Sequence, residues 1–186
     1  MAAVGAVLRE MEAEALRRRL PIIGREKGRI ITRIVYEERP MRAVEVGTNI
    51  GYSAITIASH MPEGSMLYTM EIDVDLAAEA VENIESAGLS DRISVLVGDA
   101  LDLIPDIEAP VDLAFVDAEK DEYAEYLALI ESKLRPGALV IADNAGIFGH
   151  VMGDYLERVR RSGLYESRLV FVGWDGIEVS RWRPAA

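Results

Sequence analysis

Short apolar runs and amphipathic segments alternate along the chain from about residue 41 onward. The apolar runs have the length of buried strands and lie at 43–46, 66–72, 93–97, 111–116 and 138–142. The segments between them are predicted to be helices, at 53–60, 76–87, 122–134 and 150–162. Gly88 ends the second of these helices and Arg135-Pro136-Gly137 the third. Strands that alternate with helices predict an α/β fold, with a mostly parallel sheet and helices on both faces.

The pattern changes near the C-terminal end of the chain. Two β-rich runs, 168–172 and 177–182, flank Gly173-Trp174-Asp175-Gly176, and Asp-Gly between such runs indicates a hairpin. Since a hairpin cannot add two parallel strands, we expect an antiparallel strand at or near the edge of a seven-stranded sheet. Two helices, at about 2–18 and 25–38, precede this core of residues 41–182. We predict a single domain over residues 1–186.

Composition narrows the classes of function. No apolar run approaches the roughly 20 residues of a membrane-spanning helix, and residues 1–20 interleave acidic and basic side chains, unlike a signal peptide. The absence of cysteine excludes disulfides and thiolate metal ligands. We therefore expect a cytoplasmic protein without a membrane partner. The formal charge of −12 disfavours a bulk nucleic-acid partner, because proteins that bind phosphate backbones usually carry a basic face.

The first strand ends in a glycine turn that is a candidate ligand site. Ligands of open α/β sheets bind at the carboxyl ends of the strands. Here Glu45 lies two residues before Gly47, and Gly51 completes a G-x-x-x-G spacing. A dinucleotide fingerprint needs G-x-G-x-x-G, and a carboxylate would repel a pyrophosphate. Glu45 suits a cationic ligand such as the amino group of methionine, although a tight turn also needs glycine for purely structural reasons.

Polar residues also end the second and third strands. Glu71 follows the turn by about 20 residues, where an acidic side chain can accept hydrogen bonds from two ribose hydroxyls. Asp99 and Ala100 end the third strand, where an adenine edge would lie. The alternative for Glu71 is a strand-end carboxylate in water. Together the three strand ends predict an adenosyl pocket that lacks a phosphate cradle.

The fourth and fifth strands end in oxygen ligands. Asp117 follows one, and Asp143-Asn144 follows the other. Such hard ligands are those that Mg²⁺ prefers, and with only two histidines a zinc site is disfavoured. Turn chemistry alone would account for Asp143-Asn144, but not for Asp117 with a lysine three residues later.

Lys120 is that lysine, one of only three in the chain. Arginine keeps its proton near neutral pH, whereas a lysine beside a divalent cation can lose its proton and serve as a base. The acidic neighbours Glu119, Asp121 and Glu122 oppose that loss. A solvated surface lysine is therefore the alternative.

These motifs resemble those of the catechol and caffeoyl-CoA O-methyltransferase family. The matching segments span about residues 21–182 in order, and they include Pro21–Gly28, Val44–Ser53, Tyr68–Asp73, Gly98–Pro105, Phe115–Tyr123 and Val140–Asn144. The D-x-x-K and D-N pair is the specific part. The resemblance implies a Rossmann-like class I methyltransferase fold that binds S-adenosylmethionine.

The resemblance also implies roles for individual residues. Contacts to S-adenosylmethionine would come from Ile23, Glu45, Gly47, Tyr52, Ser53, Glu71, Asp99, Ala100 and Asp117. Mg²⁺ or another divalent cation would be bound by Asp117, Asp143 and Asn144, and Lys120 would be the catalytic general base. The chain departs from the catechol enzymes at Glu119, where an aromatic residue is frequent, and at Leu169, where the animal enzymes carry an acidic residue.

The function implied is metal-assisted O-methyl transfer to a small catechol-like or vicinal-diol acceptor. Because many relatives pair, a homodimer is also implied. Three alternatives remain. One is a tRNA wobble 5-hydroxyuridine O-methyltransferase, which the acidic charge disfavours. Another is a nicotinamide-dependent oxidoreductase, which the missing third glycine disfavours. The third is a non-enzymatic S-adenosylmethionine-binding module, which would not need Asp117, Lys120, Asp143 and Asn144 together.

Overall fold

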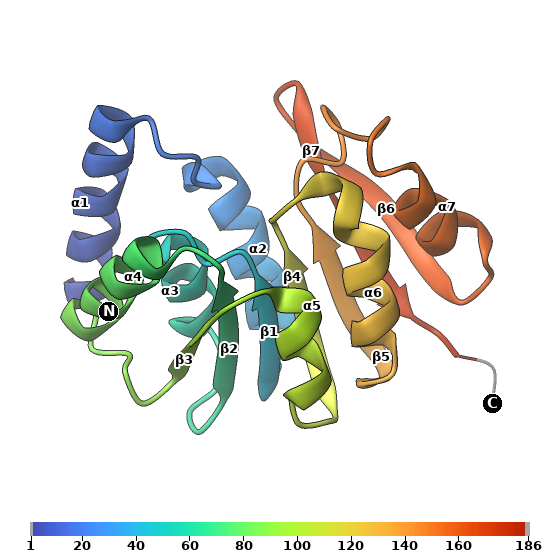
Figure 1. Cartoon of the computed structure of the whole chain (residues 1–186), viewed down its shortest axis with the longest axis horizontal. Helices are drawn as coiled ribbons and strands as arrows, with labels where there is room; N and C mark the ends of the chain where they lie inside the picture. The colour runs from blue at the N-terminus through green and yellow to red at the C-terminus, as the bar shows by residue number, and fades with distance from the viewer. Residues whose placement is uncertain (1, 185–186) are drawn as a thin grey trace. The chain divides into compact units, whose positions relative to one another are not determined.

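A computed structural model describes residues 2–184 of the chain (Figure 1). Its helices are α1 (Ala2–Arg18), α2 (Gly24–Glu38), α3 (Tyr52–Ala58), α4 (Val74–Ser86), α5 (Ala100–Leu103), α6 (Tyr123–Glu131) and α7 (Gly153–Arg161), with 3-10 turns η1 (Ile104–Asp106) and η2 (Lys120–Glu122). Its strands are β1 (Arg42–Val46), β2 (Met66–Glu71), β3 (Ile93–Val97), β4 (Val111–Val116), β5 (Leu134–Ala142), β6 (Tyr165–Val172) and β7 (Asp175–Trp182).

The seven strands form a sheet in the order β3-β2-β1-β4-β5-β7-β6. β7 runs antiparallel to both of its neighbours, β5 and β6, while β2 pairs with β3 and β4 with β1 and β5 in parallel. The predicted fold class, a mostly parallel seven-stranded sheet with an antiparallel C-terminal hairpin, is confirmed.

The largest error in the predicted boundaries lies between α6 and β5. The helix expected to reach residue 134 ends at Glu131, and β5 already begins at Leu134, which pairs with Val111. Arg135-Pro136-Gly137 therefore lies inside the strand, where the pairing with β4 shifts register and Gly137 has φ 84°. A bulge takes up the extra residues, so this proline and glycine interrupt a strand and do not end a helix. The short elements α5, η1 and η2 were not predicted.

The chain divides into two compact units. The first contains the residues up to Met41 together with Gly47–Asp99. Within it α1 packs on α3 and α4, and α2 packs on α3. Every residue of α3 is buried, so this short helix forms the centre of the unit. β2 and β3 pair from Leu67 with Ile93 to Glu71 with Val97.

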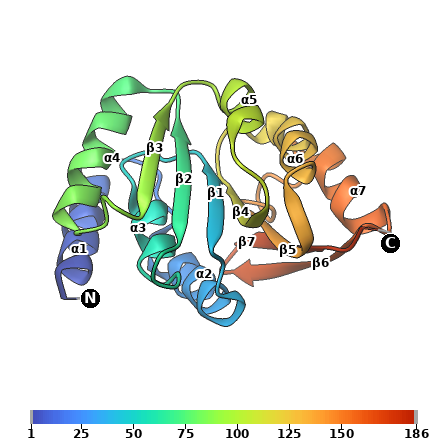
Figure 2. The same cartoon turned by 90° about the horizontal axis from the view of Figure 1, so that it is seen from below.

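The second unit contains Arg42–Val46 and the residues from Ala100 onward. β1 and β4 are buried at every position but one in each strand, as expected of parallel strands inside an α/β sheet. Figure 2 shows α5, α6 and α7 along one face of this unit's strands. Among residues 2–184, no helix is both long and apolar enough to cross a membrane. The single-domain boundaries and the cytoplasmic location stay predictions.

Candidate active site

The glycine turn of the first unit is tied to β2 by backbone and side-chain bonds. The amides of Gly47 and Thr48 both donate to the carbonyl of Met70, at 3.0 and 3.1 Å. Gly47 and Gly51 have φ of 95° and 90°, a region that favours glycine. A Cβ at Gly51 would also lie 3.3 Å from the Cβ of Ala80 on α4. Both glycines are thus required by the geometry of the turn itself.

Glu71 holds the same turn from the end of β2. Its Oε2 accepts from the backbone amide of Asn49 at 2.7 Å, and its Oε1 accepts from that of Asp73 at 3.0 Å. The side chain is buried, with 9% of its surface exposed. A carboxylate has about four lone-pair sites, so each oxygen can accept one further hydrogen bond. Glu71 can therefore order the turn and receive ribose hydroxyls together.

The other predicted cofactor residues of the first unit differ in exposure. Ile23 and Ser53 are buried, whereas Asp99 is exposed after Gly98, whose amide donates to the carbonyl of Glu71. Tyr52 is also buried, and its hydroxyl donates to Glu12 Oε1 at 2.7 Å. Burial and then this hydrogen bond raise the pKa of Tyr52. The phenol hydroxyl is engaged with α1, so any cofactor contact of Tyr52 involves its backbone or ring.

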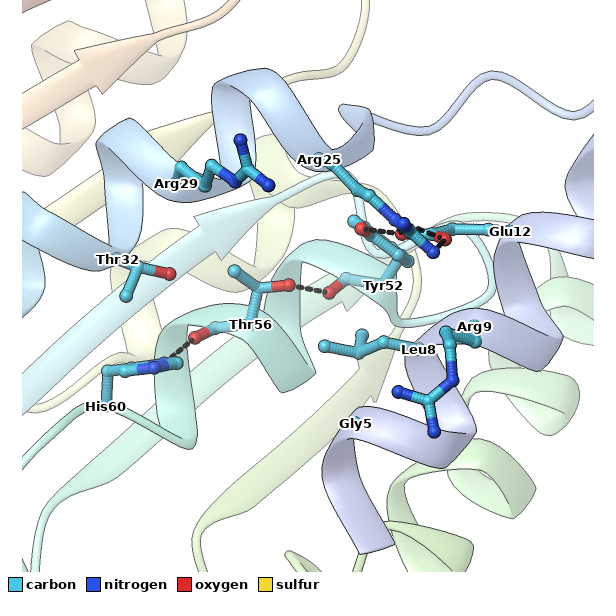
Figure 3. A pocket seen from close by; sticks show the side chains of 11 residues that line it. Gly5, Leu8, Arg9, Glu12, Arg25, Arg29, Thr32, Tyr52, Thr56 and His60 are labelled. Carbon is cyan, nitrogen blue, oxygen red and sulfur yellow. Dashed lines mark hydrogen bonds and ion pairs between the residues drawn. The ribbon is translucent and has the colours of Figure 1, made fainter. Parts of the chain in front are cut away.

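A cavity of about 420 Å³ lies between α1, α2 and α3 (Figure 3). Tyr52 lines it and is the only predicted cofactor residue that does. Glu12 and Arg25 form an ion pair of 2.6 Å at its edge, and this guanidinium holds the pKa of Glu12 below its ordinary value. The cavity is therefore distinct from the predicted adenosyl site.

In the second unit, Asp117 and Asp143 follow strand residues that lie opposite each other. Val116 on β4 pairs with Ala142 on β5, and the amide of Asp143 donates to the carbonyl of Val116 at 3.0 Å. Asp143 is buried and Asp117 is half-buried. The sheet thus places the two carboxylates at adjacent strand ends, as predicted.

Lys120 reaches back to the first of these carboxylates. Its Nζ donates to Asp117 Oδ1 at 2.8 Å, to the carbonyl of Ala118 at 2.8 Å and to the hydroxyl of Tyr123 at 3.0 Å. An ammonium has three hydrogens, so these bonds use all of them. The lysine is therefore fixed against Asp117 and is not a freely solvated side chain.

Tyr123 is a part of this arrangement that the sequence analysis missed. Its side chain is fully buried, and burial followed by the charges of Asp117 and Asp143 raises its pKa. The hydroxyl therefore stays protonated at neutral pH and can hold Lys120. The only signal in the sequence was a tyrosine three residues after the lysine, at the start of a helix.

Asn144 is held by a second residue that the sequence analysis did not assign to the site, Asp175 at the start of β7. Asn144 Nδ2 donates to Asp175 Oδ2 at 2.8 Å, and the amide of Ile147 donates to Asp175 Oδ1 at 3.1 Å. In the part of the chain that the structure describes, Asn144 Oδ1 accepts no hydrogen bond. The sequence showed Asp175 only as a hairpin-turn residue.

The donor set fits a hard divalent cation. Two carboxylates and one amide oxygen are ligands that Mg²⁺ accepts, and three protein ligands leave octahedral positions for other oxygens. Within residues 2–184, no three His, Cys, Asp or Glu side chains gather as a metal cluster. The site proposed here needs only two carboxylates, because its third ligand would be the amide oxygen of Asn144.

The remaining predicted residues lie on β1 and α5. Glu45 is fully buried on β1, and Ala100 is buried at the first position of α5. The structure thus brings together Asp117, Lys120, Asp143 and Asn144 in the second unit. It brings together Gly47, Glu71 and the neighbouring turn in the first unit.

Comparison with known proteins identifies the family. The model of the O-methyltransferase family matches residues 3–166. This chain belongs to the O-methyltransferase family. Mouse catechol O-methyltransferase is 37% identical over 151 residues, which cover 77% of this chain and 56% of the mouse protein. The pig catechol O-methyltransferase is 36% identical over 151 residues, 77% of this chain and 80% of the pig protein.

A solved O-methyltransferase structure confirms the fold of this family member. The O-methyltransferase from Bacillus cereus, in complex with SAH, superimposes with a TM-score of 0.89 at 24% identity, covering 96% of this chain and 91% of that one. At this identity the likeness shows the Rossmann-like methyltransferase fold alone. The chain spans little more than half of the mouse relative, so the activity of that whole protein is carried over only as a proposal.

Proposed function

We propose that this O-methyltransferase transfers the methyl group of S-adenosylmethionine to a hydroxyl of a small catechol-like or vicinal-diol acceptor, assisted by a divalent cation. The observation that carries the proposal is the arrangement of Lys120 against Asp117, beside the strand end that bears Asp143 and Asn144. A protein that only bound the cofactor would not need a lysine fixed to a carboxylate in this place.

The first unit supports the choice of cofactor. Its turn lacks a phosphate cradle, and the free lone pairs of Glu71 suit two ribose hydroxyls. SAH, bound to the Bacillus cereus protein, is what S-adenosylmethionine becomes when it loses its methyl group. We assign cofactor contacts to Ile23, Gly47, Tyr52, Ser53, Glu71 and Asp99 of the first unit and to Glu45, Ala100 and Asp117 of the second.

The second unit would hold the metal and the acceptor. Asp117, Asp143 and Asn144 would bind Mg²⁺ or a similar cation through their oxygens. A bound divalent cation supplies Lewis acidity, which lowers the pKa of a coordinated hydroxyl and orients it.

Lys120 would take the proton. The acceptor oxygen forms a bond to the methyl carbon as the carbon–sulfur bond breaks, and the hydroxyl proton passes to Lys120 Nζ. A neutral amine has two hydrogens and one lone pair, so one of the three present hydrogen bonds must be given up for this role. Tyr123 and Ala118 can hold the amine while its bond to Asp117 opens.

An apolar patch favours an aromatic acceptor over a nucleic acid. Ile147, Phe148 and Val151 lie three to seven residues after Asn144 and are 50%, 40% and 43% exposed. The amide of Phe148 donates to the carbonyl of Asn144 at 2.9 Å, and that of Val151 to the carbonyl of Phe148 at 2.9 Å. Exposed apolar side chains that gather on a soluble surface commonly mark binding sites. A flat ring could rest on this patch with its hydroxyls toward the metal ligands.

The test is a methyl-transfer screen with S-adenosylmethionine over catechols, vicinal diols and bulk tRNA. We expect transfer to a catechol or diol, abolished by EDTA and restored by Mg²⁺ or Mn²⁺. Asp143→Ala should lose activity at ordinary metal concentrations, while Asp154→Ala, an exposed acidic residue on α7, should not. Undiminished turnover in EDTA would remove the metal from the proposal, and methylation of tRNA alone would replace the acceptor.

A further inference from the structure

We infer that Asp175 is a positioning residue for the metal site, because it sets which end of the Asn144 amide is available as a ligand. This inference rests on the proposed function, since it assumes that Asn144 binds a cation. It adds a residue of the β6–β7 hairpin to a site whose predicted ligands all follow the parallel strands β4 and β5.

In the side-chain contact between Asn144 and Asp175, Asn144 can only be the donor and the carboxylate of Asp175 can only be the acceptor. Asp175 is 6% exposed, and its carboxylate accepts from Asn144 Nδ2. An amide has a donor end and an acceptor end. When the donor end is used by Asp175, the acceptor oxygen must point the other way, and oxygen is the atom that binds Mg²⁺. Partners that orient a ligand in this manner are a regular part of metal sites.

The backbone fixes the distance between the two side chains. Asn144 has φ 61°, and the next amide, Ala145, donates to the carbonyl of Gly176 at 3.0 Å. A Cβ at Gly146 would lie only 2.7 Å from the carbonyl carbon of Asp175. The loop after β5 is thus pressed against the hairpin turn, and the Asn144 amide has little freedom to rotate away.

The experiment compares one substitution, Asp175→Asn, in two backgrounds. In the natural chain it leaves one acceptor oxygen at residue 175 for two donors, the Asn144 side-chain amide and the backbone amide of Ile147. When that oxygen stays with Ile147, the new amide nitrogen faces Asn144, which can keep the contact only by turning its own oxygen toward residue 175. We expect the Kd for Mn²⁺, measured by electron paramagnetic resonance, to rise about 10–100-fold. In an Asn144→Asp background, the same substitution removes a contact between two carboxylates and supplies a donor. There Mn²⁺ should bind more tightly.

A purely structural role of Asp175 predicts an effect of the same sign in both backgrounds. The matched control is Glu178→Gln, which alters another buried carboxylate of β7 that is ion-paired with Arg160. This control should reduce stability and leave the Kd for Mn²⁺ unchanged. In the metal-free protein, the Asn144 side-chain amide should exchange slowly by NMR and become fast in Asp175→Ala.

The outcomes separate this inference from the proposed function. If Mn²⁺ binding is no stronger in the natural protein than in Asp143→Ala, the metal site is wrong and the role of Asp175 falls with it. If Asp143→Ala abolishes binding but Asp175→Asn acts with the same sign in both backgrounds, or does nothing, only the role of Asp175 is overturned.

The cavity between α1, α2 and α3 carries a second, independent inference. We propose that it binds a small anion with a phosphate or carboxylate group. Figure 3 shows Arg9 on α1 and Arg29 on α2 on opposite sides of the cavity. Neither side chain forms a hydrogen bond or ion pair with the rest of the described chain. Glu12 is matched by Arg25, so two positive charges are left in a protein of formal charge −12.

The size of the cavity favours a small molecule. About 420 Å³ lies within the range of roughly 300–1,000 Å³ that small-ligand sites occupy. Thr32 and Thr56 add hydroxyl groups to the lining, and Leu8 adds an apolar wall. Arginine suits this role because its planar guanidinium matches phosphate and carboxylate oxygens in pairs.

Melting curves test this second inference with pyrophosphate and with citrate, each compared with sodium chloride at equal ionic strength. At least one anion should raise the Tm of the natural protein, and Arg9→Gln with Arg29→Gln should abolish the rise. Arg33→Gln, on the same helix but paired with Glu37, is the control and should keep it. No rise in the natural protein, or an equal rise in the double variant, would overturn the proposal. The two anions separate phosphate from carboxylate ligands.

Discussion

Two loops of the molecule are built alike and are suited to different tasks. Each contains an asparagine with positive φ, Asn49 at 49° and Asn144 at 61°. In each loop a backbone amide donates a hydrogen bond to a carboxylate on a strand. This carboxylate is Glu71 in the first unit and Asp175 in the second.

The difference lies in how each asparagine uses its side chain. Asn49 Oδ1 accepts from the amide of Ile50 at 2.7 Å, and its Nδ2 donates to the carbonyl of Pro21 at 3.1 Å. Both ends of that amide stabilise the fold. Asn144 donates to Asp175 and keeps its oxygen available. The same turn conformation therefore uses both ends of the amide for the fold in one loop and leaves the proposed metal-ligand oxygen available in the other.

The largest expected effect belongs to Lys120, the general base proposed beside the second loop. Lys120→Ala should reduce the rate of methyl transfer by about 10²–10⁴-fold, the usual range for a positioned acid–base group. Lys120→Arg should restore little, because guanidinium keeps its proton. Single-turnover kinetics between about pH 6 and pH 9 would measure this, and higher pH should partly rescue Lys120→Ala.

Lys133→Ala is the matched control for this lysine. Lys133 Nζ donates to the carbonyls of Pro105 and Ile107, so its loss should affect stability but not chemistry. Rates for Lys120→Ala within a factor of about three of the natural protein would leave Lys120 as a structural ion-pair partner of Asp117.

A smaller effect should separate the two loops. Hydrogen bonds to a charged group are worth about 1.5–3 kcal/mol, so Glu71→Ala should weaken S-adenosylmethionine roughly 10- to 100-fold by calorimetry. Glu71→Gln keeps an acceptor for the amide of Asn49 and should lose less. Mn²⁺ affinity should be unchanged in both variants. Cofactor affinity equal to that of the natural protein in a folded Glu71→Ala chain would restrict Glu71 to holding the turn.

The smallest effect tests the structural asparagine. Asn49→Gly and Asn49→Ala both remove the side-chain bonds, but only alanine is strained at positive φ, by about 1–2 kcal/mol. In a chain of this size, each kcal/mol of destabilisation lowers the Tm by roughly 2–4 °C. The Tm of Asn49→Ala should therefore be lower than that of Asn49→Gly by a corresponding amount. Equal Tm values for the two variants would mean that the turn does not retain its left-handed conformation.

The strand-end residues could be predicted because a repeating βα pattern fixes where each parallel strand stops. Glu71, Asp117 and Asp143 were placed in this way, and the structure has each of them at the end of a strand. The register of β4 with β5 then brings two of them to the same level without any further signal in the sequence.

The βα pattern could not predict which side chains contact the residues of the candidate site. Asp175 lies 31 positions after Asn144, in a turn whose Asp-Gly sequence is already explained by the hairpin. Tyr123 was hidden for a related reason, since a buried tyrosine on an amphipathic helix is ordinary core. The start of β5 was misplaced because Pro136 and Gly137 suit a helix end and a strand bulge equally well.

The β6–β7 hairpin also sets an order of maturation for this protein. A ribosome delivers the first unit and the strands β1, β4 and β5 before residues 165–182 exist. Until then the edge of β5 that β7 will pair with is open to other strands, and the loop at Asn144 lacks the carboxylate of Asp175. The growing chain can thus complete the turn proposed to bind the cofactor early, whereas the loop proposed to bind the metal is among the final features to form.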